Sequence, residues 1–118
     1  MQTLFTYGSL KKGFHNYDRY LQSEKFVASA TVKGEMYSCG SYPALYKGAD
    51  TISGEIYTIT DDVFLRILGM ELRAGYSCEE VLTSKGYAYI FYYAGDDALK
   101  LKGRYIASGN WQLSDVKK

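Results

Sequence analysis

The sequence has little of the residues on which metal, thiol and triad chemistry depend. Its 118 residues include one histidine, one proline and two cysteines. Zinc sites and Cys–His or Ser–His catalysis need more histidine than this, unless His15 alone serves. Cys39 and Cys78 match no metal-ligand spacing, and we expect both to be reduced. These chemistries are therefore disfavoured before any motif is considered.

The chain also lacks an excess of charge and a long apolar run. Lys and Arg number 14 against 13 Asp and Glu, with no basic stripe or acidic tail, so we expect no nucleic acid and no membrane partner. The longest apolar run, 87–94, is too short to span a bilayer. A strand-like segment starts at once without signal-peptide features, which predicts a cytoplasmic protein.

What the chain does have is tyrosine, 13 in all, which favours strands. We find no repeat or linker and expect one domain, 1–118. Strands should outnumber helices, with connections too short for repeated βαβ crossovers. This predicts an α+β fold: a small mixed, largely antiparallel β-barrel, closed or strongly curved, flanked by short helices. The expected segments are strands 2–7, 28–36, 51–59, 77–83 and 86–94, helices near 14–22 and after Thr60, and a turn-rich stretch at 39–43.

Two local patterns make this prediction specific. In the strand 51–59, Ile52 and Ile56 fall on one face and Tyr57 and Ile59 on the other. Thr60 is a typical helix N-cap, because two aspartates follow it in the first turn, where the helix dipole favours them.

Glu71 is an unusually placed carboxylate. It continues the apolar stripe Phe64, Ile67 and Leu68 at the spacing of one helix face. Burial of an unpaired carboxylate is costly and raises its pKa, which suits a general acid/base working near neutral pH. The alternative is that Gly69 ends the helix, so that Glu71 turns to solvent or pairs with a neighbouring arginine.

The second candidate is the loop Tyr7-Gly8-Ser9-Leu10, directly after the first strand. A strand that ends in Gly-Ser lets successive backbone N–H groups point into one concavity that suits a carboxylate or an oxyanion. The same residues are also common turn chemistry. The glycine spacing of residues 8–13 is not that of a phosphate-binding P-loop.

Five short motifs follow one another along nearly the whole chain. They are Tyr7-Gly8-Ser9-Leu10, Tyr42-Pro43-Ala44-Leu45, Ser53-Gly54-Glu55-Ile56-Tyr57, Met70-Glu71 with Gly75-Tyr76, and Ile106-Ala107-Ser108-Gly109-Asn110-Trp111. In this order they resemble the motifs of the γ-glutamylcyclotransferase-like family. The loop just described resembles the family's Tyr-Gly-Ser/Thr-Leu motif, and the segment around Glu71 resembles the one that holds its catalytic glutamate.

The resemblance implies a fold, a reaction and a set of roles. Members have a small mixed β-barrel with a pocket between the loop and the glutamate. They cyclise a γ-glutamyl group to 5-oxoproline and release an amine or amino acid. Carried over, the backbone of residues 7–10 would hold the substrate's α-carboxylate, Glu71 would shuttle the proton, and Tyr76 could add a hydroxyl. No metal or cofactor is implied, and we expect a monomer or weak homodimer.

Two positions depart from the family pattern. The family often has an acidic residue shortly before the glutamate and an arginine soon after the Gly-Tyr pair. This chain has Leu68-Gly69 and Ser77-Cys78 there. Elsewhere, we expect His15 on an exposed helix face and Trp111 in a packing role.

Two other functions stay open at this stage. A binding module could hold a small anionic metabolite in the same pocket without turnover, and a Glu71 that points to solvent would favour it. An interaction protein could use its tyrosine-rich strands as an interface, which an exposed tyrosine patch with no pocket near Gly8 would support.

Overall fold

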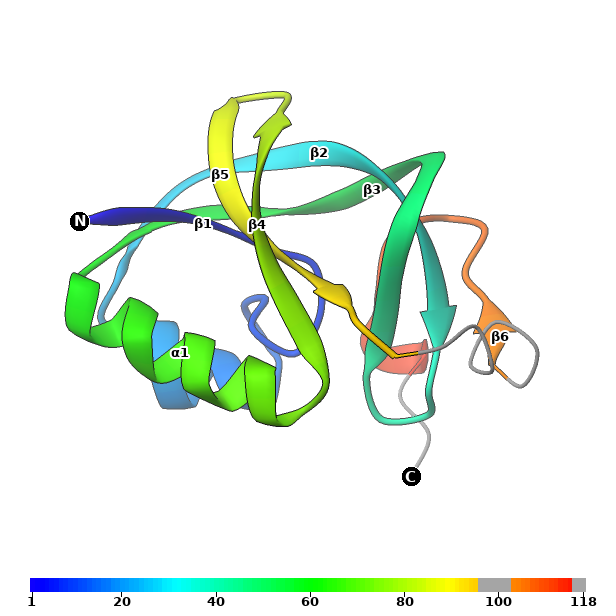
Figure 1. Ribbon diagram of the computed structural model, residues 1–118, viewed down its shortest axis with the longest axis horizontal. Helices are drawn as coiled ribbons and strands as arrows, with labels where there is room; N and C mark the ends of the chain where they lie inside the picture. The colour runs from blue at the N-terminus through cyan, green and yellow to red at the C-terminus, as the bar shows by residue number, and fades with distance from the viewer. Residues whose placement is uncertain (96–102, 116–118) are drawn as a thin grey trace.

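A computed structural model describes residues 1–95 and 103–115, which form one six-stranded sheet with its longest helix, residues 61–73, along one side (Figure 1). The sheet order is β4-β5-β1-β3-β2-β6. The elements are β1 (Gln2–Thr6), η1 (Tyr17–Leu21), β2 (Lys25–Ser38), β3 (Pro43–Ile59), α1 (Asp61–Arg73), β4 (Tyr76–Thr83), β5 (Gly86–Tyr93), β6 (Arg104–Tyr105) and η2 (Leu113–Asp115).

The sheet is mixed and strongly curled. The β1–β5 pair is parallel, and every other neighbouring pair is antiparallel. The turn between β4 and β5 reaches β2, three strands away from β5. There the backbone N–H of Ser84 donates to the Thr31 carbonyl at 2.9 Å, and the Thr31 N–H donates to Ser84 Oγ at 2.9 Å. The described strands thus form a half-barrel, which confirms the predicted α+β class.

The hairpin of β2 and β3 is longer than the sequence patterns predicted. The strand expected at 51–59 begins at Pro43, where the prediction placed a turn-rich stretch, and Ser38 pairs with Pro43 across the hairpin. Proline is tolerated at the first position of a strand, because its missing N–H breaks no ladder bond there. The extension matters because it brings Pro43 against the loop that follows β1.

The two faces of the sheet bury separate apolar clusters. Ile52 and Ile56 lie in the first cluster and Tyr57 and Ile59 in the second, as the alternation predicted. The second cluster is covered by α1 through Ile67, which is fully buried. Burying a side chain of this size stabilises the fold by about 1.5–3 kcal/mol.

Helix α1 begins and ends at recognisable caps. Thr60 Oγ1 accepts a hydrogen bond from the Val63 N–H at 3.2 Å, which confirms the predicted N-cap. The helix continues through Gly69 to Arg73, so the alternative that Gly69 ends it is wrong. The turn is made instead by Gly75, whose φ of 94° favours glycine. No helix in the described ranges is long and apolar enough to cross a membrane.

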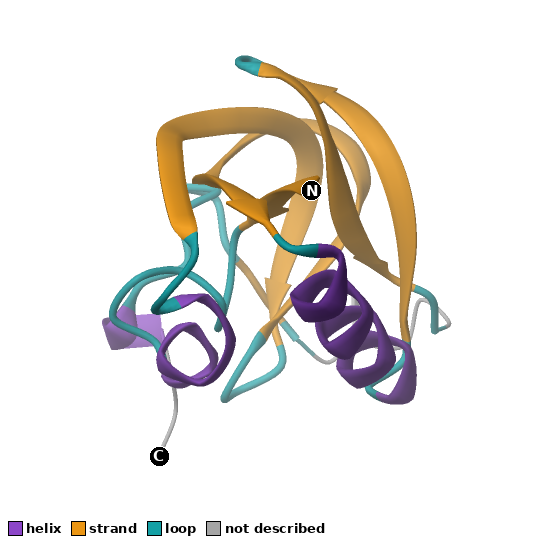
Figure 2. Ribbon diagram, turned by 90° about the vertical axis from the view of Figure 1, so that its left-hand side faces the viewer, coloured by secondary structure: helices purple, strands orange, loops and turns teal. Residues whose placement is uncertain are grey.

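The predicted helix near residues 14–22 is shorter than expected. Its regular part, η1, is a single wide turn that buries Leu21 completely. It lies beside α1 on the same side of the sheet (Figure 2). The Arg66 guanidinium lies 5.7 Å from the Tyr20 ring centroid, so the two helices also touch through a cation–π contact.

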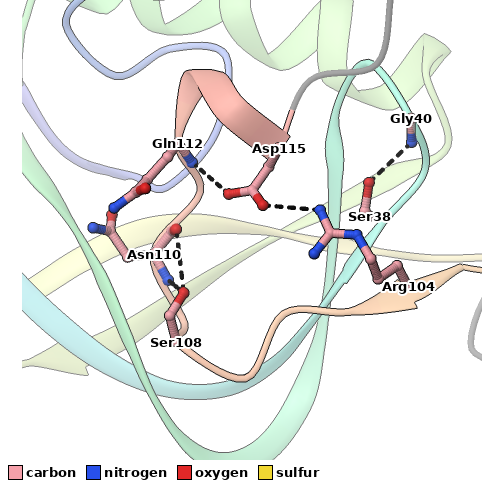
Figure 3. Close-up of polar contacts among 7 residues, drawn as sticks. All are labelled: Ser38, Gly40, Arg104, Ser108, Asn110, Gln112 and Asp115. Atoms are coloured by element: carbon pink, nitrogen blue, oxygen red, sulfur yellow. Dashed lines mark hydrogen bonds and ion pairs between the residues drawn. The ribbon is translucent and has the colours of Figure 1, made fainter.

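The segment 104–115 is held against the sheet by polar contacts (Figure 3). Asp115 pairs with Arg104 at 2.8 Å and accepts the Gln112 N–H at 2.9 Å. The Ser53 N–H donates to the Gly109 carbonyl at 2.8 Å. Trp111 is only 1% exposed, which confirms its packing role. Cys39 and Cys78 are both free, as expected.

Candidate active site

A cavity of about 340 Å³ lies between the loop after β1, the last turns of α1 and the start of β3. All six residues predicted for the site line it, although they come from three different parts of the fold, which are the loop after β1, helix α1 and strand β4. They are Tyr7, Gly8, Ser9, Leu10, Glu71 and Tyr76. Because the cavity includes Gly8, the structure does not show the arrangement that would have supported an interaction protein, which is an exposed tyrosine patch with no pocket near Gly8.

Glu71 is the charged group at the centre of the arrangement. It lies in the last turns of α1, half-buried, and its side chain makes no hydrogen bond or ion pair with any residue in the described ranges. Burial raises the pKa of its carboxyl to about 7. Glu71 and residues 7–10 line the same cavity, and a carboxyl with this pKa can both accept and release a proton at neutral pH.

This raised pKa predicts a pH-dependent stability. Between the ordinary carboxyl pKa and about 7 the folded protein binds more protons than the unfolded chain, so stability falls as pH rises through that range and then levels. Replacing Glu71 by Gln removes the cost of burying an ionised carboxylate. We expect the variant to gain up to about 3 kcal/mol over wild type at pH 8 and little at pH 4.5.

The check is denaturant unfolding of both proteins at the two pH values. Glu80→Gln is the matched control, because Glu80 is exposed on β4 and undergoes the same chemical change. A Glu71→Gln gain that is equal at both pH values would contradict a raised carboxyl pKa.

The loop after β1 presents unused backbone donors. The Gly8 carbonyl accepts from the Lys11 N–H at 2.9 Å, and the Ser9 carbonyl accepts from two N–H groups of the following turn at 3.1 and 3.2 Å. The N–H groups of Gly8, Ser9 and Leu10 have no acceptor among the described residues. Three free donors on one loop that lines the cavity are a candidate carboxylate-binding group.

Glycine is required at position 8 because the Pro43 ring lies close to its Cα. A Cβ at this position would lie 2.8 Å from Pro43 Cγ and 3.0 Å from Pro43 Cδ. The loop therefore packs directly on the first residue of β3. This contact explains how the Tyr-Pro motif, which sequence patterns left without a role, forms one wall of the cavity.

Lys11 follows the loop but does not line this cavity. Its Nζ donates to Asn110 Oδ1 at 2.9 Å and to the Trp111 carbonyl, so the cation is committed to the C-terminal segment. Desolvation lowers the pKa of this ammonium group, opposed by the charges of Glu55 and Asp115. An anion on the loop would be held by neutral donors and not by a lysine.

Tyr7 and Tyr76 form fixed walls with engaged hydroxyls. The Tyr7 hydroxyl donates to the Phe91 carbonyl, and the Tyr76 hydroxyl donates to the Pro43 carbonyl at 2.6 Å. Desolvation, with a contribution from the Glu71 charge, raises the pKa of both phenols. Tyr76 therefore has a lone pair, and no proton, to offer a ligand.

The cavity also contains residues that sequence patterns did not place there. His15 is exposed, as predicted, yet it lines the cavity. Asn16 and Met70 line it as well. His15 and Asn16 are polar positions of the predicted helix 14–22, and Met70 lies in α1; periodicity could not show that these two segments pack around the loop after β1.

The fold and the cavity together define a class: a small curled-sheet protein in which a candidate acid/base carboxyl and a loop of free N–H donors line one cavity. The family model described as gamma-glutamyl cyclotransferase, AIG2-like, matches residues 4–113. The chain belongs to this family, which confirms the resemblance seen in its motifs. The gamma-glutamylcyclotransferase family protein YtfP of Escherichia coli K12 is 29% identical over 111 residues, covering 92% of this chain and 94% of that protein.

Solved structures agree with the fold. An uncharacterized protein of Pyrococcus horikoshii matches with a TM-score of 0.81 and 27% identity, covering 93% of this chain and 89% of its own. An AIG2-like protein of Mus musculus matches with a TM-score of 0.77, covering 99% and 94%. At 18% identity, the second likeness shows the fold alone.

Proposed function

We propose that the protein is a γ-glutamyl cyclotransferase that converts a small γ-glutamyl amine or peptide to 5-oxoproline and a free amine. One observation carries the proposal. A half-buried carboxyl with a pKa of about 7 and no ionic partner in the described ranges shares a cavity with a loop of free N–H donors. Membership of the family supports the same reaction.

The proposed reaction uses each part once. The substrate's α-carboxylate binds the N–H groups of Gly8, Ser9 and Leu10. The ionised Glu71 removes a proton from the α-ammonium group. The α-nitrogen then attacks the γ-carbonyl carbon, and a five-membered ring closes as a C–N bond forms. When the bond to the departing nitrogen breaks, Glu71 returns the proton to that nitrogen. The second proton of the ring nitrogen passes to the released amine, which leaves as an ammonium ion.

Ring closure explains why no side-chain nucleophile is required. The attacking nitrogen belongs to the substrate, and holding the chain folded over supplies the proximity effect, which can be worth several kcal/mol. The cavity then has two tasks, which are to hold the substrate's carboxylate and to move one proton. A loop and a single glutamate suffice for both.

The experiment is a screen for 5-oxoproline release with γ-glutamyl amines, γ-glutamyl amino acids and glutathione. For the best substrate we expect kcat/KM to rise with pH up to about 7 and then level, because ionised Glu71 is the base. His15 is another cavity residue that could act as a base. If Glu71 is the base, the His15→Gln variant should keep the inflection.

The outcome separates this proposal from a binding module. Ligands recovered intact, with measurable affinity, would replace the cyclotransferase by a protein that sequesters a small anionic metabolite. Release of 5-oxoproline with an inflection that disappears in His15→Gln would keep the reaction but move the base from Glu71.

A further inference from the structure

Asn16 lies between the two sides of the cavity. Its Nδ2 lies 2.8 Å from Ser9 Oγ and 4.0 Å from Met70 Sδ. Its backbone N–H donates to the Ser9 carbonyl at 3.1 Å. The residue is half-buried and lines the cavity. One side chain therefore joins the loop to the helix residue directly before Glu71.

The surroundings of the amide decide which way it faces. A thioether sulfur has lone pairs and no proton, so it can only accept a hydrogen bond. The two N–H protons of Nδ2 can serve Ser9 Oγ and Met70 Sδ together. The reversed amide would place Oδ1 against Sδ, two acceptors facing each other. Asn16 is thus the donor in its bond to Ser9.

The consequence is a defined polarity for the Ser9 hydroxyl. A hydroxyl has one proton, and an oxygen that accepts a bond from Asn16 keeps that proton for another partner. No residue in the described ranges accepts it. The Ser9 hydroxyl, which lines the cavity, is therefore a fourth donor beside the three N–H groups of the loop.

We propose that Asn16 is a positioning residue: by donating to Ser9 Oγ it turns the Ser9 hydroxyl into a hydrogen-bond donor for the α-carboxylate of the substrate. The inference rests on the proposed function for the identity of the ligand. The Lys11 ammonium group is bound to Asn110, so the substrate carboxylate depends on neutral donors. Loss of one of these donors should therefore weaken substrate binding measurably.

The test compares Asn16→Asp and Asn16→Ala with wild type. In Asn16→Asp the new carboxylate accepts the Ser9 proton, which reverses the hydroxyl, and adds a negative charge beside the anion site. We expect KM to rise roughly tenfold to a hundredfold, the usual worth of a hydrogen bond to a charged group, with kcat changed much less. Asn16→Ala should show a smaller rise.

A double-mutant cycle separates positioning from general support of the loop. If Asn16 acts through Ser9, Asn16→Ala added to Ser9→Ala should raise KM no further than Ser9→Ala alone. If Asn16 only supports the loop, the two effects should add. Additive effects, or a wild-type KM in Asn16→Asp, would overturn the proposal.

A binding measurement keeps this inference distinct from the proposed reaction. The dissociation constant of 5-oxoproline, measured by calorimetry, reports on carboxylate recognition without turnover. Binding to wild type that weakens in Asn16→Asp, with no turnover of any substrate, would refute the cyclotransferase and support the positioning role. Turnover by wild type with unchanged KM and unchanged 5-oxoproline affinity in Asn16→Asp would refute the positioning role alone. A wild type that neither reacts nor binds would refute both.

Discussion

Glu71→Gln should lose 5-oxoproline release by at least about a hundredfold in kcat while its fold is retained. The amide has nearly the same shape as the carboxyl but can neither take the proton from the α-ammonium group nor return it. Substrate affinity should change little, because the α-carboxylate is bound by the loop at residues 8–10. The measurement is kcat and KM on the best substrate from the screen, with calorimetric binding of 5-oxoproline.

The stability of this variant makes the result interpretable. Because burial raises the carboxyl pKa to about 7, the same substitution should stabilise the protein at pH 8. An inactive variant that is more stable than wild type cannot owe its inactivity to unfolding. Glu80→Gln, at an exposed position, should keep full activity. Wild-type turnover by Glu71→Gln would remove Glu71 from the mechanism.

Alternation and capping were enough to predict most of the fold. Ile52 and Tyr57 were correctly assigned to opposite faces, and Thr60 to the start of the helix. The errors arose where tertiary contacts override local preference. Pro43 reads as a turn residue, but it begins β3 because its ring packs on Gly8, 35 residues away in the sequence. Gly69 reads as a helix end, but Gly75 makes the turn.

The candidate site was predictable in part for the same reason. A carboxylate on an apolar stripe is visible as a pattern, so Glu71 was found, and the motifs paired it with the loop. Asn16 was not found, because its importance depends on contacts with Ser9 and with Met70. Met70 lies in α1, which is far from Asn16 in the sequence. Nor could the pattern show that Lys11 turns away from the loop. Such facts follow from packing and not from periodicity.

Gly54→Ala should be strongly destabilising although Gly54 lies away from the cavity. A Cβ at Gly54 would lie 2.2 Å from the Thr6 carbonyl oxygen and 2.5 Å from Phe5 Cζ. Neither can move easily, because β1 is held between β3 and β5. We expect a loss of about 3 kcal/mol or more and a fall in Tm on the order of 10 °C, measured by thermal unfolding.

The expected loss of stability in Gly54→Ala has a steric cause, and substitution of a second glycine, Gly86, tests this cause. Gly86 has a φ of 106° but nothing within 4 Å of an added Cβ, so Gly86→Ala pays only backbone strain of about 1–2 kcal/mol. An equal loss in both variants would show that the approach to β1 is not the cause. Since Thr6 leads directly into the loop at residues 7–10, Gly54→Ala should also weaken 5-oxoproline binding, whereas Gly86→Ala should not. The strand contact that fixes β1 thus also fixes the loop that faces Glu71.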